Sequence, residues 1–442
     1  MFNKEELINV TGAEVLFDSG EDLNLSVSTD TRTIKENNIY LPLKGESFDG
    51  ENFIGKALDS GAKAYFTSGD GIVPGAKLVL KVSDTKQAYI KLASYYRHKI
   101  NPITVGITGS AGKTTTKELV SSVLGVKYKT QKTYSNHNNE IGFCQTVLGM
   151  NEDTQALVCE MGMRGLGEIE EISVPLNPDY AIITNCGSAH VGRLGSLDNI
   201  AIAKCEIAKG LKPDGVFIAL DQEITKKHLN FSGEKIFYSL KDVKILEHAP
   251  SYSKFEYKSF IYELNVEGEY NIENSLSAIN LGLKLGMSCE EIYKGLKAYR
   301  PIEKRWELED VCGYKFVNDS YNANPESMKA SVKTFVELYD KPLVILGDMG
   351  ELGENESLYH YQVGEYFSKF NKDVTYLTVG NLAKKIGEPL KEKGFKVLNF
   401  SCNEEVSRYI VENLDKSYTI FLKASRSMKF EEIIGNIRNR GI

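Results

Sequence analysis

The sequence lacks the features that mark a membrane-inserted or secreted protein. No apolar run approaches the roughly 20 residues that span a bilayer, and a run such as 215–220 is far shorter. The first residues, MFNKEELINV, contain no apolar signal core. The seven cysteines are scattered and form no CxxC pair, so we interpret them as free thiols of a reducing compartment. We therefore expect a cytoplasmic protein without membrane insertion.

Positive charge is also in short supply. The 53 Lys and Arg residues face 60 Asp and Glu residues, and the net charge is −7. This balance disfavours a nucleic-acid partner, so an anionic ligand would need a local cationic or amide-lined site. We expect small-molecule substrates and a monomer. The composition, 42% hydrophobic and 26% charged, excludes a disordered or fibrous chain.

The chain is too long for one compact domain, since 442 residues correspond to about three domains of roughly 150 residues. No repeat, low-complexity tract or long linker is visible. Asn101-Pro102 and Arg300-Pro301 interrupt the pattern and suggest boundaries. We predict a smaller mixed α/β unit over 1–100, a central unit over 101–310 and a C-terminal unit over 311–442.

Strand and helix patterns alternate in the second and third units, which predicts α/β domains built on parallel sheets. In the central unit the expected strands are 103–107, 156–159, 180–184 and 215–220. Residues 254–266 alternate with period two and suggest an antiparallel hairpin at the edge of that sheet. The C-terminal unit reads as a doubly wound, Rossmann-like domain, whose ligands should lie beyond the carboxyl ends of its strands.

The sharpest motif is Gly109-Ser110-Ala111-Gly112-Lys113-Thr114-Thr115, which follows an apolar strand and precedes a helix over 117–124. Small residues let backbone N–H groups curl around phosphate oxygens, and the helix N-terminus adds positive potential. Lys113 can neutralise the β- and γ-phosphates of ATP, and the Thr114 hydroxyl can ligate Mg²⁺. The loop is shorter than the usual template, because Ile107 stands where the first glycine is expected. A plain glycine-rich turn with a surface lysine is the alternative interpretation.

Metal ligands are expected near this phosphate loop. Glu160 directly follows an apolar strand, and His190 comes shortly after the next one, so both could face the loop across adjacent strand ends. Taken alone, Glu160 could be a loop carboxylate and His190 a structural histidine. Lys204, within a helical stretch over 200–209, reads by itself as an ordinary helix lysine.

Together these residues resemble the Mur ligase superfamily, ATP-dependent enzymes that form amide bonds in peptidoglycan assembly, over nearly the whole chain. The motifs that carry the resemblance are Ser28-Thr29-Asp30-Thr31-Arg32, residues 136–142, Glu160-Met161-Gly162, Thr184-Asn185, Ala189-His190, Ala203-Lys204-Cys205-Glu206-Ile207, Tyr270-Asn271-Ile272-Glu273-Asn274, Lys304-Arg305-Trp306-Glu307, Asp319-Ser320-Tyr321-Asn322-Ala323-Asn324-Pro325, Gly347-Asp348-Met349-Gly350-Glu351-Leu352-Gly353 and Lys423-Ala424-Ser425-Arg426. The Tyr-Asn-Ala-Asn-Pro run and the Gly-Asp-Met-x-Glu-Leu-Gly turn point to the branch that adds a dipeptide.

The resemblance implies roles that spacing does not show. Lys204 matches a lysine that is carbamylated in this superfamily, and the new carboxylate helps to hold a second Mg²⁺ with Glu160 and His190. Asn271 and Asn274 match adenine-side asparagines, Arg305 an arginine on the nucleotide phosphates, and Asp319 an acidic residue on the ribose. The substrate-binding residues it implies are Thr29, Asp30 and Arg32 for the uridine diphosphate end, Asn136, Asn138 and Asn139 near the UDP-sugar, and Asn322, Asn324, Ser327, Lys423, Ser425 and Arg426 for the dipeptide.

The implied reaction is ATP-dependent ligation of D-alanyl-D-alanine to UDP-N-acetylmuramoyl-tripeptide through an acyl phosphate, with ATP and two Mg²⁺ ions as cofactors. Lys113, Lys204 and His190 are its expected catalytic residues. The sequence departs from the family at Phe143 and Cys144, where an aliphatic residue and then proline are usual, and at Glu51, where histidine is usual. These departures affect the expected UDP-sugar contacts. Two alternatives stay open, namely a related ligase with another amine or a folate-type substrate, and a non-catalytic ATP-binding protein on the same fold.

Overall fold

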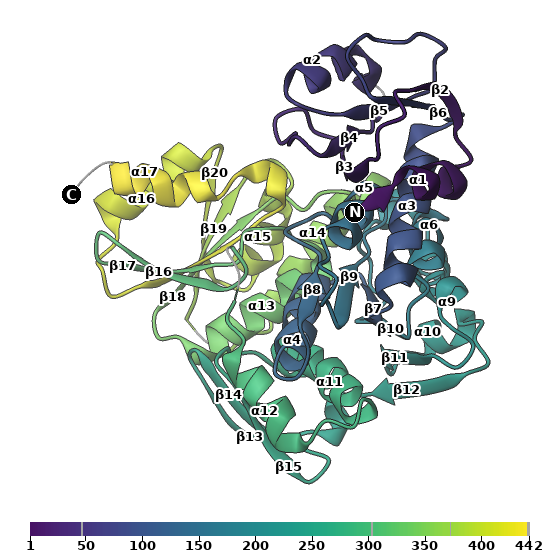
Figure 1. The fold of residues 1–442 in the computed structure, drawn as a ribbon. Helices are drawn as coiled ribbons and strands as arrows, with labels where there is room; N and C mark the ends of the chain where they lie inside the picture. Colours follow the sequence, from purple (N-terminus) through teal and green to yellow (C-terminus); the bar gives the residue numbers. More distant parts are fainter. Residues whose placement is uncertain (46, 302–303, 372, 440–442) are drawn as a thin grey trace.

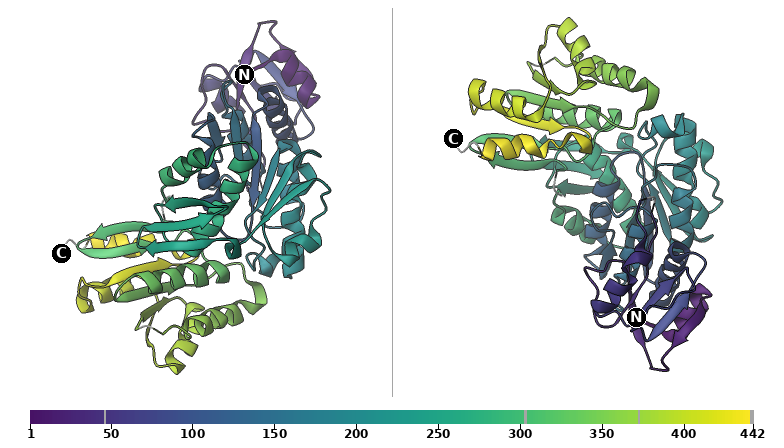
Figure 2. Two further views of the ribbon diagram at one scale, coloured as in Figure 1. Left: turned by 90° about the horizontal axis from the view of Figure 1, so that it is seen from below. Right: turned by 90° about the horizontal axis from the view of Figure 1, so that it is seen from above.

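The computed structural model describes residues 1–45, 47–301, 304–371 and 373–439. Within these ranges the chain forms three six-stranded sheets and one three-stranded sheet, each flanked by helices (Figure 1). The N-terminal and C-terminal units pack on different sides of the middle unit (Figure 2). The molecule is therefore a three-unit α/β protein, as the sequence predicts.

The N-terminal sheet has the order β1-β3-β4-β5-β6-β2, with antiparallel strands at both edges and parallel strands between them. Its strands are β1 (Phe2–Asn3), β2 (Glu14–Asp18), β3 (Asn24–Ser28), β4 (Asn38–Tyr40), β5 (Ala64–Thr67) and β6 (Leu78–Lys81). The short helices α1 (Lys4–Thr11) and α2 (Ile54–Asp59) cover it. The Asp84 side chain then caps α3 (Thr85–Ile100), which leads into the middle unit and ends at Asn101 in the left-handed conformation.

The middle sheet is parallel throughout, in the order β12-β11-β10-β7-β9-β8. Its strands are β7 (Ile103–Thr108), β8 (Thr130–Lys132), β9 (Ala156–Glu160), β10 (Tyr180–Ile183), β11 (Val216–Leu220) and β12 (Glu234–Tyr238). Its helices are α4 (Lys113–Leu124), α5 (Glu140–Leu148), α6 (Glu168–Leu176), α7 (Val191–Leu194), α8 (Leu197–Cys205), α9 (Ile207–Gly210), α10 (Glu223–His228), α11 (Glu269–Lys284) and α12 (Cys289–Ala298). Because parallel strands end at one edge, the loops after β7, β9 and β10 meet there.

The predicted hairpin over 254–266 exists, but its predicted place is wrong. β14 (Tyr252–Tyr257) and β15 (Phe260–Leu264) pair with β13 (Lys244–Ala249) in a separate antiparallel sheet, and no described strand joins them to the parallel one. The alternating apolar side chains Phe255, Tyr257, Tyr262 and Leu264 are buried in the core that α11 and α12 share. One buried face is enough to produce period-two alternation, so the pattern could not show which sheet the hairpin joins.

The third sheet has the order β16-β17-β21-β18-β19-β20 and is parallel except for the edge pair β16 and β17. Its strands are β16 (Glu307–Val311), β17 (Tyr314–Asn318), β18 (Pro342–Gly347), β19 (Thr375–Val379), β20 (Lys396–Phe400) and β21 (Thr419–Lys423). Its helices are α13 (Pro325–Leu338), α14 (Glu356–Phe367), α15 (Ala383–Glu392), α16 (Asn403–Asn413) and α17 (Glu431–Asn439). The sheet begins at Glu307, before the boundary at residue 311 that the sequence suggests.

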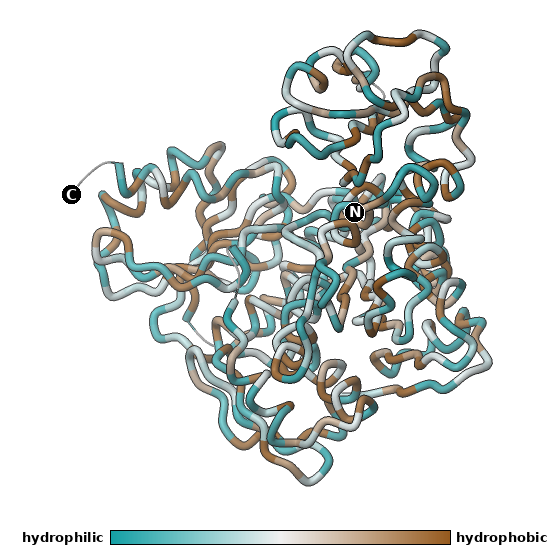
Figure 3. Tube along the Cα trace, in the orientation of Figure 1, coloured by the Kyte–Doolittle hydropathy of each residue, from teal (hydrophilic) through white to brown (hydrophobic). Residues whose placement is uncertain are grey.

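Apolar side chains form cores on both faces of the sheets. One core is shared by the first two units, since Leu92 and Tyr96 of α3 pack in the same cluster as Phe143 and Val147 of α5. The third unit has two clusters of its own. Hydrophobic and hydrophilic stretches alternate along the trace, and no described helix is long and apolar enough to cross a bilayer (Figure 3).

Candidate active site

The phosphate loop joins β7 to α4. Gly109 has φ +157°, and a Cβ there would lie 1.8 Å from Thr184 Oγ1, while Gly112 is left-handed at φ +77° against the Asn274 side chain. These positions explain the two glycines, because a side chain fits at neither. The helix begins at Lys113, a turn earlier than predicted. Asn185 fixes the loop from the β10 side, accepting a hydrogen bond from Ala111 N at 3.0 Å and donating to Ala111 O at 3.1 Å.

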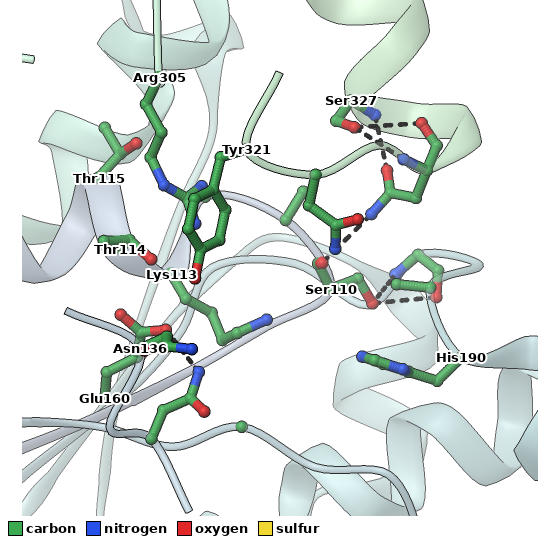
Figure 4. Close-up of a pocket in the computed structure, with 18 of the residues that line it drawn as sticks. Ser110, Lys113, Thr114, Thr115, Asn136, Glu160, His190, Arg305, Tyr321 and Ser327 are labelled. Atoms are coloured by element: carbon green, nitrogen blue, oxygen red, sulfur yellow. Dashed lines mark hydrogen bonds between the residues drawn. The ribbon is translucent and has the colours of Figure 1, made fainter. Parts of the chain in front are cut away.

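Lys113 lies at the centre of the site (Figure 4). Its ammonium donates to Gly109 O at 2.7 Å, so the side chain folds back over the loop that would hold phosphates. Burial lowers the pKa of Lys113, Glu160 opposes that effect, and the positive charge of Arg305 adds to it. Lys113 and Arg305, which are far apart in sequence, therefore bring two cations close together.

Glu160 is the last residue of β9 and is buried. Its Oε1 accepts a hydrogen bond from Asn138 Nδ2 at 3.0 Å, while Oε2 is buried without a hydrogen-bond partner among the described residues. A buried carboxylate oxygen without a donor is costly and is a position where a cation would bind. Elsewhere in the described chain, too, no three His, Cys, Asp or Glu side chains gather into a ready-made metal cage.

His190 faces the third unit as well as the phosphate loop. It adopts the left-handed conformation at φ +67°, and its Nδ1 lies 2.6 Å from Glu351 Oε2. This contact with His190 lowers the pKa of the Glu351 carboxyl. The contact is close but does not meet hydrogen-bond geometry. A carboxylate beside one ring nitrogen, with the other nitrogen left for a ligand, is an arrangement also found at metal-bound histidines.

Lys204 lies near the end of α8 and is only 1% exposed. Burial is the main cause that lowers its pKa to about 7, and the charge of Lys113 adds to the effect. No described residue forms a hydrogen bond or ion pair with its ammonium. The interpretation of Lys204 as an ordinary helix lysine does not fit this environment, because such lysines keep their head groups in water.

A cavity of about 1470 Å³ connects these groups. Most of the site residues expected from the sequence line it: Ser110, Ala111, Gly112, Lys113, Thr114, Thr115, Asn136, Asn138, Asn139, Glu160, His190, Asn271, Asn274, Arg305, Asp319, Asn322, Asn324, Ser327, Lys423, Ser425 and Arg426. The expected residues outside its lining are Gly109, Lys204, Thr29, Asp30 and Arg32. Gly109 is the first residue of the phosphate loop, Lys204 is buried near the end of α8, and the last three residues belong to the N-terminal unit.

Several expected substrate residues already have structural partners. Asn139 caps α5, and Asn324 and Ser327 form the capping box of α13. Lys423 is buried and forms an ion pair of 2.5 Å with Asp319, which also accepts a hydrogen bond from Ser331. These contacts hold the side chains in place along the cavity wall. Each of these residues therefore has a structural function, whether or not it also binds a ligand.

The third unit closes over the phosphate loop through direct contacts. Asn324 Nδ2 donates to Ser110 O at 3.3 Å, and the Glu326 carboxylate accepts from both N and Oγ of Ser188 at 2.9 Å. Farther along, Gly192 packs so tightly on the loop before α14 that a Cβ would lie 2.2 Å from Gly353 N. The cavity thus lies between the two units.

Sequence reasoning did not assign Tyr321, Glu326 or Glu351 to the site, although all three line the cavity. Tyr321 and Glu351 belong to motifs that carry the family resemblance, so those motifs could have indicated that both residues lie at the site. Glu326 is an ordinary helix glutamate in sequence terms, and only the packing of two units reveals its contact with Ser188.

The departures from the family pattern do not reach the cavity. Phe143 and Cys144 are buried in the core between α5 and α3, and neither lines the cavity. The Glu51 carboxylate accepts hydrogen bonds from Thr67 Oγ1 at 2.8 Å and Ser68 N at 2.6 Å. Glu51 therefore stabilises the loop after β5, and its side chain has a structural role that histidine could not fill in the same way.

Comparison with known proteins places this geometry in a family. Three family descriptions match in chain order: "Mur ligase family, catalytic domain" at 26–97, "Mur ligase middle domain" at 107–282, and "Mur ligase, glutamate ligase domain" at 304–426. The chain belongs to the Mur ligase family. The three matches of this Mur ligase lie within the three sheet-bearing units.

Curated relatives match over nearly the full length of this Mur ligase. UDP-N-acetylmuramoyl-tripeptide–D-alanyl-D-alanine ligase of Bacillus subtilis is 37% identical, covering 93% of this chain and 92% of its own. The protein of the same name from Haemophilus influenzae is 30% identical over 98% of both chains. Among solved structures, MurF from Acinetobacter baumannii superposes with a TM-score of 0.89 at 27% identity, covering 99% of both chains.

Proposed function

We propose that this Mur ligase joins D-alanyl-D-alanine to UDP-N-acetylmuramoyl-tripeptide at the expense of ATP, forming ADP and phosphate. The relatives from Bacillus subtilis and Haemophilus influenzae carry the name of this activity and align over more than nine tenths of each chain. The reaction completes the cytoplasmic peptidoglycan precursor. We propose that the enzyme acts as a monomer.

The observation that supports it most is the enclosure of a phosphate loop by another unit. Lys113 and Glu160 come from the middle unit, Asp319 and Asn324 come from the third, Arg305 comes from the segment just before β16, and all line one cavity. A ligase needs this arrangement because two anions, the acceptor carboxylate and ATP, must meet away from water. We assign residues 1–100 to the UDP-sugar, 101–310 to ATP, and 311–442 to the dipeptide and the nucleotide.

The donor set fits Mg²⁺ and a carbamate. Glu160 Oε2 is a buried oxygen without a hydrogen bond, and the Thr114 hydroxyl lies at the start of α4. Mg²⁺ prefers such oxygens. Two bound Mg²⁺ ions would neutralise the phosphates and hold them in line. His190 and a carbamylated Lys204 would complete the ligands of the second ion.

Lys204 is well suited to carbamylation. Its neutral amine attacks CO₂ and releases a proton, and a pKa of about 7 keeps a large neutral fraction near neutral pH. An unmodified ammonium has no anionic partner among the described residues, and these residues contain no group of three His, Cys, Asp or Glu side chains that could hold a metal without a further carboxylate. Carbamylation would replace the unpaired positive charge of Lys204 with a carboxylate that can bind a metal ion.

In the proposed mechanism the terminal carboxylate of the acceptor attacks the γ-phosphate, giving an acyl phosphate and ADP. The amine of D-alanyl-D-alanine then attacks the acyl carbon, and phosphate leaves. Lys113 neutralises the transferring phosphoryl group, and Asn185 holds the loop N–H groups in place. Asn324 and Glu326 keep the third unit closed, which shields the acyl phosphate from water.

Phosphate release tests the function directly. The whole chain is assayed with ATP, Mg²⁺ and both acceptor forms, carrying L-lysine or meso-diaminopimelate, with and without D-alanyl-D-alanine. We expect release only when acceptor and dipeptide are both present, and the preferred acceptor identifies the third residue. Release with another amine or a folate-type acceptor instead would establish the related-ligase alternative, and binding of ATP without release under any condition would establish the non-catalytic one.

The carbamate has its own test. Lys204→Ala is expected to be nearly inactive with an unchanged circular dichroism spectrum, and acetate should restore part of the activity by occupying the vacated carboxylate position. Lys209→Ala is the matched control, because Lys209 is exposed on the adjacent helix α9. Wild-type turnover in Lys204→Ala or Lys204→Arg would exclude the carbamate.

A further inference from the structure

Arg305 is held in the cavity in an unusual way. Its guanidinium carbon lies 4.3 Å from the centre of the Tyr321 ring, and the two groups lie against each other beside Lys113 (Figure 4). No described residue accepts a hydrogen bond from Arg305, and its buried Nε has no partner. The guanidinium of Arg305 therefore has the Tyr321 ring against one face, and the N–H groups at its edge have no acceptor among the described residues.

The backbone on both sides of Arg305 is fixed in a conformation that these residues rarely adopt. Lys304 and Trp306 have φ values of +57° and +61°, in the left-handed region where a bulky residue is disfavoured. Such strain persists only when the surroundings over-determine it, and it is concentrated at functional sites. Arg305 therefore leaves the chain in a direction set by its two neighbours.

Packing supplies the force that maintains this backbone. Trp306 is buried, with its ring centroid 5.5 Å from that of Phe421 on β21 and 6.0 Å from that of Tyr270 on α11. On the other side, Tyr321 N donates to Lys304 O at 3.0 Å, which ties the ring-bearing loop to the segment before Arg305. The backbone segments that carry Tyr321 and Arg305 are thus tied to each other and to the buried Trp306.

We infer that Tyr321 is a positioning residue for nucleotide binding, acting as an aromatic platform that orients Arg305 toward the phosphates of ATP. The inference rests on the proposed function for the identity of the anion. A carboxylate in place of the ring would compete with phosphate for the N–H groups, whereas a ring holds the flat guanidinium by its face and leaves the edge free for two parallel hydrogen bonds.

Proximity to the phosphate loop supports this assignment. The charge of Arg305 contributes to lowering the pKa of Lys113, so the two cations repel each other when no anion lies between them. A bound phosphate would relieve the repulsion. Tyr321 would contribute by preventing Arg305 from turning away to solvent.

The test is a double-mutant cycle read by calorimetric binding of a non-hydrolysable ATP analogue with Mg²⁺, using the whole chain without acceptor or dipeptide. Tyr321→Leu is expected to weaken binding about tenfold, and Tyr321→Phe, which keeps the ring, should restore it to within about twofold of wild type. In an Arg305→Ala background, Tyr321→Leu should cause no further loss. In turnover, Tyr321→Leu should raise the KM for ATP more than it lowers kcat.

Tyr366→Leu is the matched control. Tyr366 lies under Lys329 at 5.8 Å in the same unit and does not line the cavity, so its loss removes a comparable pair without touching Arg305. It should leave analogue binding unchanged, and thermal unfolding of each variant separates lost binding from lost folding.

Three results would overturn the inference. Equal losses from Tyr321→Leu in the wild-type and Arg305→Ala backgrounds would show that Tyr321 acts independently of Arg305. If Tyr321→Phe binds the analogue as weakly as Tyr321→Leu, the aromatic ring does not position Arg305. Wild-type affinity in Tyr321→Leu would remove the role altogether, whereas a wild-type chain that binds no nucleotide would overturn the proposed function together with this inference.

Discussion

Lys113 is half-buried and Lys204 is buried, and both have lowered pKa values, yet the proposed chemistry requires opposite charge states of them. In the proposed mechanism Lys113 has to be charged when ATP binds, because it would neutralise phosphate. A bound phosphate would be an anionic partner for Lys113 and would raise its pKa again. Lys204 would have to be neutral to react with CO₂, and its surroundings contain no carboxylate that would keep it protonated.

Lys113→Ala should lower kcat at least 100-fold while the fold is kept, since alanine is a good helix former and one transition-state contact is lost. The measurement is phosphate release with saturating substrates, alongside the thermal midpoint. Lys127→Ala is the control, because Lys127 is exposed just beyond the other end of α4. Turnover near wild type in Lys113→Ala would contradict the phosphate-loop assignment.

Lys204 also predicts a dependence of stability on pH. Its folded-state pKa of about 7 lies below the ordinary value of 10.5, so the unfolded chain binds more protons between these values. The unmodified ammonium therefore destabilises the fold fully below pH 7, and this cost disappears as the pH rises toward 10.5. Lys204→Met should be more stable than wild type at pH 7, by on the order of a few kcal/mol.

Chemical denaturation in CO₂-free buffer with a chelator measures this difference. The advantage of Lys204→Met should shrink steadily from pH 7 to pH 10 and stay constant below pH 6. A difference that grows with pH would mean that the lysine is stabilised as an ammonium in the fold.

At the scale of elements, sequence patterns predicted the features that depend on residues close together in the chain. The strand, glycine turn and helix around Lys113 were identifiable because phosphate binding by backbone N–H groups demands small residues in sequence. The cap at Asp84 and the capping boxes at Ser288 and Asn324 likewise arise within four residues. The hairpin over 254–266 was predicted correctly as a hairpin and misplaced, because alternation reports burial and not the identity of the neighbouring sheet.

Contacts between units could not be predicted from residue spacing. Glu326 and Ser188 are far apart in sequence and meet only because α13 points its first turn at the loop after β10. The resemblance supplied residue roles without supplying partners, so it did not indicate that Asp319 is paired with Lys423. Arg32 is likewise held by Asp30 through a bidentate ion pair, which a phosphate ligand would have to share.

The first turn of α13 provides a test at this scale. Asn324→Asp keeps the capping oxygen, and aspartate caps as well as asparagine, so stability should be unchanged. It also replaces the N–H donor that binds Ser110 O with a carboxylate, so kcat should fall about tenfold. Asn324→Ala should lose the same activity and about 1 kcal/mol of stability in addition. Unaltered turnover in Asn324→Asp would show that this contact has no catalytic value.

For the whole molecule, the proposed mechanism requires the third unit to dock on the second. Gly192→Ala places a methyl group 2.2 Å from Gly353 N, which docking cannot accommodate. We expect kcat to fall at least tenfold. Small-angle scattering should show that the variant fails to compact when the ATP analogue and the UDP-sugar peptide are added, whereas wild type compacts.

Gly435→Ala is the control for that experiment, since a Cβ at Gly435 in α17 meets nothing within 4 Å. Its radius of gyration should respond to ligands as in wild type. Compaction of Gly192→Ala equal to wild type would mean that the contact between the two glycines is not part of closure.

The cluster that joins α3 to α5 has a consequence for how the chain unfolds. Leu92 and Tyr96 share one core with Phe143 and Val147, so the first two units lose their apolar cover together, while the third unit has cores of its own. Although there are three units, cooperativity should divide the molecule into two blocks, and heating should give two calorimetric transitions. A fragment starting near residue 101 would expose the α5 face and aggregate, whereas one ending near residue 300 keeps its cover and should refold unaided.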